Sequence, residues 1–125
     1  MNINLIKEML KEGTDAGVTF VTTGEEGPHV SNTWNSYLKL CEDGRLLAPV
    51  GGMQITEKNL LNNPKMLVSI SNRNVEGFHS KGTGVVVEAE GKLVFSGVDV
   101  EDMKSSHPWV RAVLSIKILD VKQTQ

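Results

Sequence analysis

Short β-branched segments that end at glycine-containing turns occupy most of this 125-residue chain. Residues 18–23 end at the turn-forming sequence GEEGP, and residues 29–40 end at a second turn signal, Glu42-Asp43-Gly44. The same composition predicts further strands at residues 45–50, 65–71, 83–90, 92–96 and 110–121. Six or seven short strands indicate a small antiparallel barrel, because closure removes the exposed edges of a flat sheet.

The segments between these strands predict two or three short helices. Apolar residues at helical spacing indicate an amphipathic helix over residues 3–12, which Gly13 would end. Thr56 is expected to cap a short helix that stops before Pro64, and residues 99–106 are expected to form another. Residues 72–84 lack periodicity and predict a loop, and Gly91 is expected to be the turn of a hairpin.

Length and charge restrict the class of protein. A chain of this length favours a single domain, residues 1–125, with one core. Thirteen Lys and Arg against fifteen Asp and Glu give a net charge of −2, which argues against strong binding to nucleic acid or to an anionic membrane. Cys41 is the only cysteine, so we expect no disulfide and a cytoplasmic location. No secretion signal or membrane span is expected.

Two clusters of residues point to a ligand. Asn32, Thr33, Trp34, Asn35 and Ser36 follow one another in a predicted strand. They suit a ligand with a flat aromatic body and many hydrogen-bonding groups, or else Trp34 fills the core while the polar side chains face solvent.

The second cluster is Gly51-Gly52, between a strand and a helix start. Adjacent glycines let the backbone approach a ligand closely, and the N–H groups of a helix start favour an anion such as phosphate. The alternative is an ordinary strand-to-helix turn.

Other chemistry has little support in the sequence. His29, His79 and His107 are isolated, so we expect no metal site. The chain has no GxSxG motif, no phosphate-binding P-loop and no GxGxxG fingerprint. No catalytic side chain is therefore assigned.

The combined pattern resembles the small FMN-binding proteins of anaerobic bacteria, which belong to the pyridoxamine-phosphate-oxidase-like split-barrel family. The resemblance is carried by the runs GPH, NTWNSYLK, PVGGM and TE within residues 27–57, and by GTG, WVRA and QT nearer the C-terminus. It covers nearly the whole chain, and as a combination it is specific.

The resemblance implies a six-stranded, antiparallel Greek-key split barrel, a homodimer, and one non-covalent FMN per subunit at the dimer interface. It places the phosphate end of FMN at Gln54, Ile55 and Thr56, and brings Trp109 and Gln125 to the flavin of the other subunit. The implied cofactor-binding residues are Asn32, Thr33, Trp34, Asn35, Pro49, Val50, Gly51, Gly52, Gln54, Ile55, Thr56, Trp109 and Gln125.

One position departs from the family pattern, because Ile55 stands where that pattern has a lysine. We therefore expect weaker FMN binding, with the Thr33 and Thr56 hydroxyls and backbone N–H groups holding the phosphate. Lys58 and Arg73 are possible replacement cations.

The sequence thus predicts an FMN-binding redox protein, either an electron carrier with a redox partner protein or an oxidoreductase acting on a small-molecule acceptor. One alternative is a split barrel for haem, for a deazaflavin or for no cofactor. Another is a small barrel that stacks single-stranded nucleic acid on Trp34 and Tyr37 near Lys39.

Overall fold

The computed structural model describes residues 3–11 and 16–125. Its elements are α1 (Ile3–Met9), β1 (Gly17–Gly24), β2 (Gly27–Trp34), the 3₁₀ turn η1 (Asn35–Tyr37), β3 (Lys39–Leu40), β4 (Leu46–Val50), α2 (Gln54–Asn62), β5 (Lys65–Glu76), β6 (Lys81–Val94), α3 (Val98–Ser106) and β7 (Ala112–Gln123). The strands form one antiparallel sheet in the order β2-β1-β5-β6-β7-β4-β3. The expected mainly-β antiparallel architecture with short helices is confirmed.

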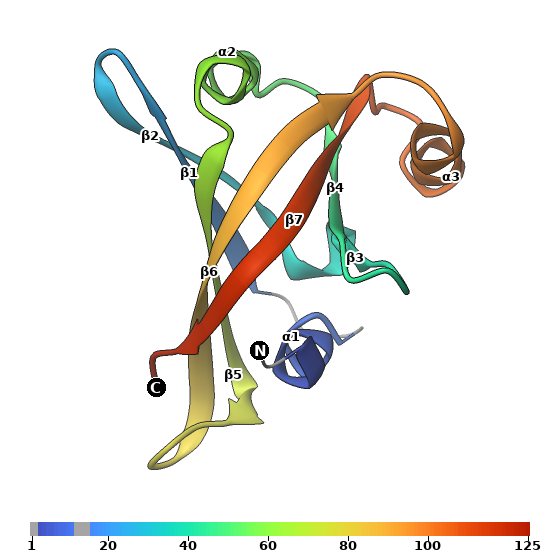
Figure 1. Ribbon diagram of the computed structural model, residues 1–125. Coiled ribbons are helices and arrows are strands. Elements are labelled where there is room, and N and C mark those ends of the chain that lie inside the picture. The colour runs from blue at the N-terminus through green and yellow to red at the C-terminus, as the bar shows by residue number, and fades with distance from the viewer. Residues whose placement is uncertain (1–2, 12–15) are drawn as a thin grey trace.

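The sheet differs from the expected six-stranded barrel in two ways. It has seven strands, because the chain after η1 forms the two-residue strand β3 against β4. Its outermost strands, β2 and β3, do not pair with each other within the described ranges, so hydrogen bonding leaves the sheet open. Figure 1 shows that the strands nevertheless curl around a common interior, as right-handed twist favours.

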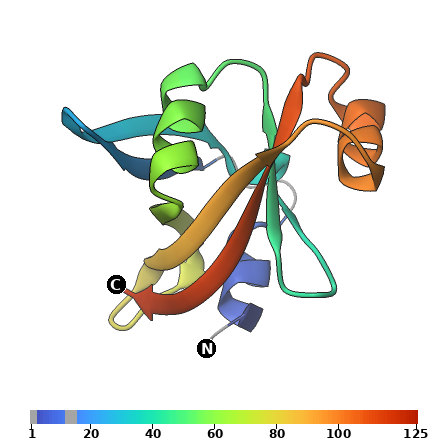
Figure 2. The same cartoon turned by 45° about the horizontal axis from the view of Figure 1, so that its top comes forward.

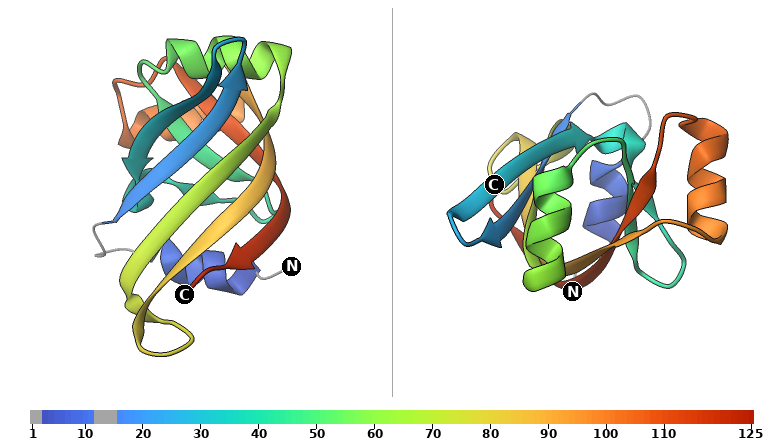
Figure 3. Two further views of the ribbon diagram at one scale, coloured as in Figure 1. Left: turned by 90° about the vertical axis from the view of Figure 1, so that its left-hand side faces the viewer. Right: turned by 90° about the horizontal axis from the view of Figure 1, so that it is seen from above.

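Helices close the two ends of the curled sheet. Figures 1 and 2 place α2 across the end where β1 and β2 meet, while α1 lies at the other end and α3 stands outside next to β7. The left view of Figure 3 shows α1 and α2 at opposite ends of the strands. Phe20, Ile6 and Met9 are fully buried in the core between them. Within the described part of the chain, no helix has the length and apolar character needed to span a membrane.

Gly91 is not the turn of a hairpin, so that prediction is wrong. β6 runs straight through Gly91, which pairs with Ile116 of β7. A Cβ atom at this position would lie 2.5 Å from Met66 Sδ and 3.2 Å from Leu114 Cδ1. Glycine is needed here because neighbouring side chains approach the backbone closely.

The predicted loop over residues 72–84 is also mostly wrong. β5 continues to Glu76 and β6 begins at Lys81, so that only residues 77–80 connect them. Ladder pairing extends from Asn72 opposite Thr83 to Glu76 opposite Lys81, with an irregularity between them. Pairing between distant segments therefore overrides a locally polar, glycine-rich composition.

Two other predicted element boundaries differ from those in the structure. The predicted strand over residues 29–40 is interrupted after Trp34 by η1. The second helix begins at Gln54, after a left-handed Met53, so Thr56 lies inside α2 and is not its cap. The helix predicted over residues 99–106 is confirmed within one residue, whereas Gly13 lies outside the described residues.

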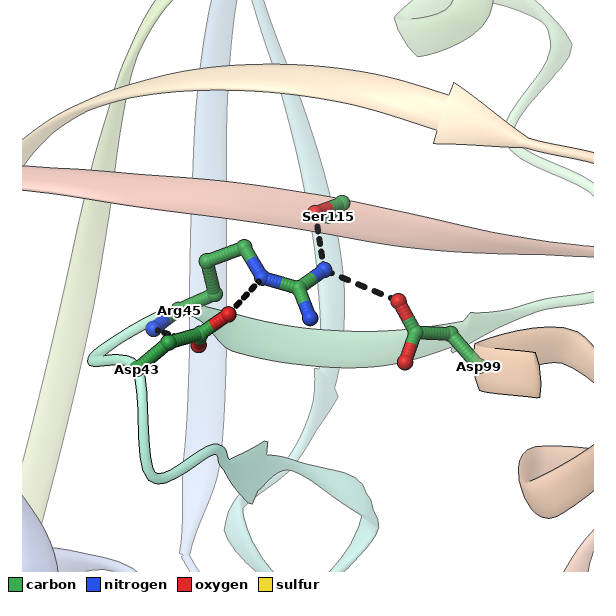
Figure 4. Close-up of polar contacts among 4 residues, drawn as sticks. All are labelled: Asp43, Arg45, Asp99 and Ser115. Carbon is green, nitrogen blue, oxygen red and sulfur yellow. Dashed lines mark hydrogen bonds and ion pairs between the residues drawn. The ribbon is translucent and has the colours of Figure 1, made fainter. Parts of the chain in front are cut away.

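Arg45 joins three separate elements (Figure 4). Its Nε donates to Asp43 Oδ2 at 2.8 Å, and its Nη1 donates to Asp99 Oδ2 at 2.8 Å and to Ser115 Oγ at 3.2 Å. The β3–β4 turn, the first turn of α3 and β7 are thus held together. Hydrogen bonds to Asp99 and Asp43 raise the pKa of Arg45, and burial raises the pKa of the nearby Cys41 thiol.

This network predicts a pH-dependent loss of stability in Asp43→Asn. Hydrogen bonds from the Arg45 side chain and backbone lower the pKa of Asp43, so this carboxylate stabilises the fold above its unfolded-state pKa. The contribution disappears as pH falls through the lowered pKa. Urea unfolding should therefore show a variant that is less stable at pH 7 and equal to the parent in acid. In an Arg45→Gln background, Asp43→Asn should lower the free energy of unfolding much less. An equally large loss in that background would show that the Arg45 side chain is not what makes the Asp43 carboxylate stabilising.

Candidate functional site

The polar run on β2 is divided between the two faces of this edge strand. Ser31 Oγ lies 3.2 Å from Thr56 Oγ1 of α2, so Ser31 and Thr33 share the face toward α2. Asn32 and Trp34 share the opposite face, where Asn32 Oδ1 accepts a 2.8 Å hydrogen bond from Thr19 Oγ1. Trp34 is 49% exposed and does not fill the core. Its ring is therefore available to a ligand or to another chain.

Asn35 is separated from the rest of this run. Its side chain is fully buried, where Nδ2 donates to Met9 O at 3.1 Å and Oδ1 accepts from Ala16 N at 3.1 Å. These bonds tie the end of β2 to α1 and to the start of β1. The structure thus places the Asn35 side chain in the core and not beside Gly51-Gly52.

The connection from β4 to α2 brings several predicted residues together. Pro49 and Val50 are buried in β4, so they offer only their main chain to a ligand at this end. Gly51, Gly52 and a left-handed Met53 follow, and Glu57 N makes the first helical hydrogen bond, to Met53 O at 2.9 Å. The N–H groups of Gln54, Ile55 and Thr56 therefore have no helical acceptor, and they form the positive end of α2.

The two glycines have different surroundings. A Cβ on Gly51 would lie 3.2 Å from Trp109 Cε3, because the indole covers this residue. A Cβ on Gly52 would meet no atom within 4 Å, and its φ is not in the left-handed region. Neither its conformation nor its packing against the described residues requires glycine at position 52. The free space beside Gly52 is where another molecule can approach the backbone.

Arg111 is a residue of this site that the sequence did not identify. Its Nε donates to Gly51 O at 2.9 Å and to Gly52 O at 3.2 Å, and its Nη2 donates to Gly52 O at 2.5 Å. Nη2 also lies 2.8 Å from Glu57 Oε1. An open groove of about 440 Å³ is lined by Gln54, Glu57, Lys58, Leu61 and Arg111. Arg111 lies in the WVRA run, but that run does not reveal its role, because its partners are carbonyl groups about sixty residues earlier.

An aromatic cluster borders the same connection. Trp109, 52% exposed, has its ring centroid 5.6 Å from His107 and 6.0 Å from Tyr37, and Tyr37 and His107 are 4.8 Å apart. His107 Nδ1 is 2.9 Å from Ser106 Oγ, which fixes the plane of the imidazole. Residues 3–11 and 16–125 contain no group of three or more His, Cys, Asp or Glu suited to a metal ion.

Gln125 and Arg73 lie away from this end of the molecule. Gln125 O accepts hydrogen bonds from Thr83 Oγ1 at 2.5 Å and from Gln123 Nε2 at 3.0 Å, next to the β5–β6 hairpin. Arg73 lies beside Gly82 in the same hairpin. Figure 1 shows this hairpin and the C-terminus at the end of the sheet opposite α2. Within one chain, Gln125 therefore does not join the Gly51-Gly52 group, whereas Lys58 does lie next to it.

Comparison with known proteins identifies similar sequences and folds. The FMN-binding protein of Nitratidesulfovibrio vulgaris (strain Miyazaki F) is 37% identical over 117 residues, 94% of this chain and 93% of that protein. HupZ of Group A Streptococcus has a TM-score of 0.76 at 15% identity, covering 98% of this chain and 93% of that one. An FMN-binding protein from Syntrophomonas wolfei has a TM-score of 0.69 at 15% identity, with 98% and 90% covered. At such identities the two structures establish the fold alone. No family model matches the chain.

Proposed function

Because this chain belongs to the family of the Nitratidesulfovibrio FMN-binding protein, as its sequence pattern predicted, we propose that it binds FMN non-covalently and acts as a redox protein. The observation that carries the proposal is the open, glycine-lined connection into α2. Five consecutive N–H groups, from Gly52 to Thr56, have no acceptor in the described part of the chain. Such a run of donors at a helix start suits a phosphate group.

The residues present fit the phosphate end of FMN. The backbone at Gly52 is accessible to a ligand. The N–H donors around it are uncharged dipoles, so binding a phosphate there requires no proton transfer. Thr56 is fully buried with its hydroxyl beside Ser31, so this pair offers an O–H donor at the same place. We propose that Gly52, Gln54, Ile55 and Thr56 hold the phosphate, with Thr33 on the neighbouring face of β2.

The half-exposed aromatic rings fit the flavin ring. Trp34 and Trp109 each present a large apolar surface, about half of which the described part of the chain leaves uncovered. We propose that these rings and the Asn32 amide bind the isoalloxazine and shield it from water. FMN, once bound, supplies the electron-transfer chemistry, while the protein sets its affinity and environment.

We propose that a second copy of the chain covers the outer face of β2, β1 and β5. Val30 pairs with Val21, and Val21 pairs with Leu67, which gives a continuous apolar row on the same face as Trp34. Glu88 of β6 is opposite Leu67, and both line a groove of about 460 Å³ together with Leu119. Exposed apolar surface of this kind favours an interface between proteins. We propose that the second copy also contributes its Gln125, which lies away from the site in its own chain.

The dimer is tested by sedimentation. The parent protein should sediment as a dimer, and Leu67→Lys should shift it toward monomer because a charge replaces an apolar contact. Leu61→Lys, at an exposed position of α2, is the matched control and should stay dimeric. A parent protein that is monomeric with FMN firmly bound would contradict both the dimer and the cross-subunit roles of Trp109 and Gln125.

The cofactor is tested by the absorption spectrum of freshly purified protein and by titration of apoprotein with FMN. Flavin bands together with saturable binding are expected. A haem or deazaflavin spectrum would show that the protein binds that cofactor instead of FMN. Binding of single-stranded DNA without flavin would favour the nucleic-acid alternative on Trp34 and Tyr37.

Gly52→Ala should weaken FMN binding without destabilising the fold. The added methyl group meets no atom of residues 3–11 or 16–125, so the free energy of unfolding of the apoprotein should change by less than about 0.5 kcal/mol. FMN affinity should fall about tenfold, because the methyl group occupies the ligand's space. Gly24→Ala is the opposite control, since its methyl group would overlap the Asn59 side chain and destabilise the apoprotein. Unchanged FMN affinity in Gly52→Ala would show that Gly52 does not contact FMN.

Ile55→Lys should tighten FMN binding. Ile55 is 56% exposed in the first turn of α2, and a cation near a dianionic phosphate contributes about 1 kcal/mol in a partly screened site. The gain should shrink at high salt and be absent for riboflavin, which lacks the phosphate. Val98→Lys adds the same charge at an exposed position of α3 and should have little effect. Equal gains from both substitutions would show that Ile55 is not near the phosphate.

A further inference from the structure

The carbonyl groups of the Gly51-Gly52 turn all point to one side chain. Arg111 donates to Gly51 O and Gly52 O, and its own backbone N donates to Val50 O at 2.9 Å. Three consecutive carbonyl groups are therefore held by one residue of the segment that precedes β7. Glu57 pairs with Arg111 Nη2 and so links the guanidinium to α2 as well.

Peptide geometry determines what this contact does to the N–H groups. In a trans peptide the C=O and N–H bonds point in opposite directions. Since Gly51 O and Gly52 O point toward Arg111, the N–H groups of Gly52 and Met53 point away from it. Neither N–H has an acceptor in residues 3–11 or 16–125. Two adjacent donors thus point away from Arg111, and the position beside Gly52 is open.

We propose that Arg111 is a positioning residue for the cofactor phosphate: by holding the Gly51 and Gly52 carbonyls it keeps the Gly52 and Met53 N–H groups directed at the phosphate. This inference rests on the proposed FMN binding. Two adjacent glycines have many accessible conformations, and only some of them align these donors. Arg111 orders the turn before the ligand arrives, which removes part of the entropy cost of binding.

A direct phosphate contact by Arg111 is the competing explanation. The guanidinium already has two carbonyl partners and the Glu57 carboxylate, and the pair carries no net charge. Positioning through neutral peptide dipoles predicts a contribution that salt hardly screens. A direct ion pair with phosphate predicts a contribution that salt weakens.

The test compares the parent protein with the double variant Arg111→Met/Glu57→Gln, because this pair has no net charge in either protein. Apoprotein of each is titrated with FMN and with riboflavin at low and high salt. The double variant should bind FMN about tenfold more weakly than the parent, by the same factor at both salt concentrations, with riboflavin affinity unchanged. Circular dichroism and thermal unfolding establish that the double variant is folded.

Each other outcome has a definite meaning. A loss of FMN affinity that shrinks at high salt would show direct contact and overturn the positioning role. An equal loss for FMN and riboflavin, or no loss, would also overturn it. A parent protein that binds neither flavin would instead overturn the proposed function.

A second measurement needs no flavin. NMR relaxation of the apoprotein should show ordered Gly52 and Met53 amides in the parent and mobile ones in the double variant. Equal order in both proteins would contradict the proposal even if FMN does not bind.

Discussion

The antiparallel pairing of β4 with β7 determines where the candidate site forms. It sets Val50 opposite Ala112, which brings the residues after β4 next to the residues before β7. Gly51 therefore lies under Trp109, and the Gly51 and Gly52 carbonyls lie within reach of Arg111. A slip of one residue would turn every side chain of β4 to the other face, so the buried side chains of this strand fix the register. Packing in the core thus determines the geometry at the surface.

Polar contacts from α2 hold the other side of the site. Asn59 Nδ2 donates to Thr22 Oγ1 of β1 at 3.1 Å in a buried position, and Thr56 contacts Ser31 of β2. Buried polar groups that are paired in this way specify one arrangement, because any shift leaves them unsatisfied. The edge strand β2, which pairs with β1 alone in the sheet order, is therefore also held by α2. The start of α2 keeps a fixed position relative to β2 and to the turn after β4.

Local sequence signals predicted those features that depend on neighbouring residues. The Gly51-Gly52 turn, the helix after it and α3 all have glycine, proline or helix-forming signals within a few positions. Features that depend on distant partners were missed or misread. Gly91 has the sequence appearance of a turn, but close packing against Met66 and Leu114 explains it. Asn35 belongs to a ligand-like run, yet its partners are main-chain groups of Met9 and Ala16.

The electrostatics of the candidate site follow from the same partners. Ile55 brings no charge to the first turn of α2, Arg111 is neutralised by Glu57, and Lys58 lies in the open groove where water screens it. What remains at the start of α2 is a set of N–H dipoles and hydroxyl groups with little net charge. A phosphate held by such donors depends on their alignment more than on the attraction of distant charges. Order in the Gly51-Gly52 turn is therefore the property on which the proposed phosphate binding depends.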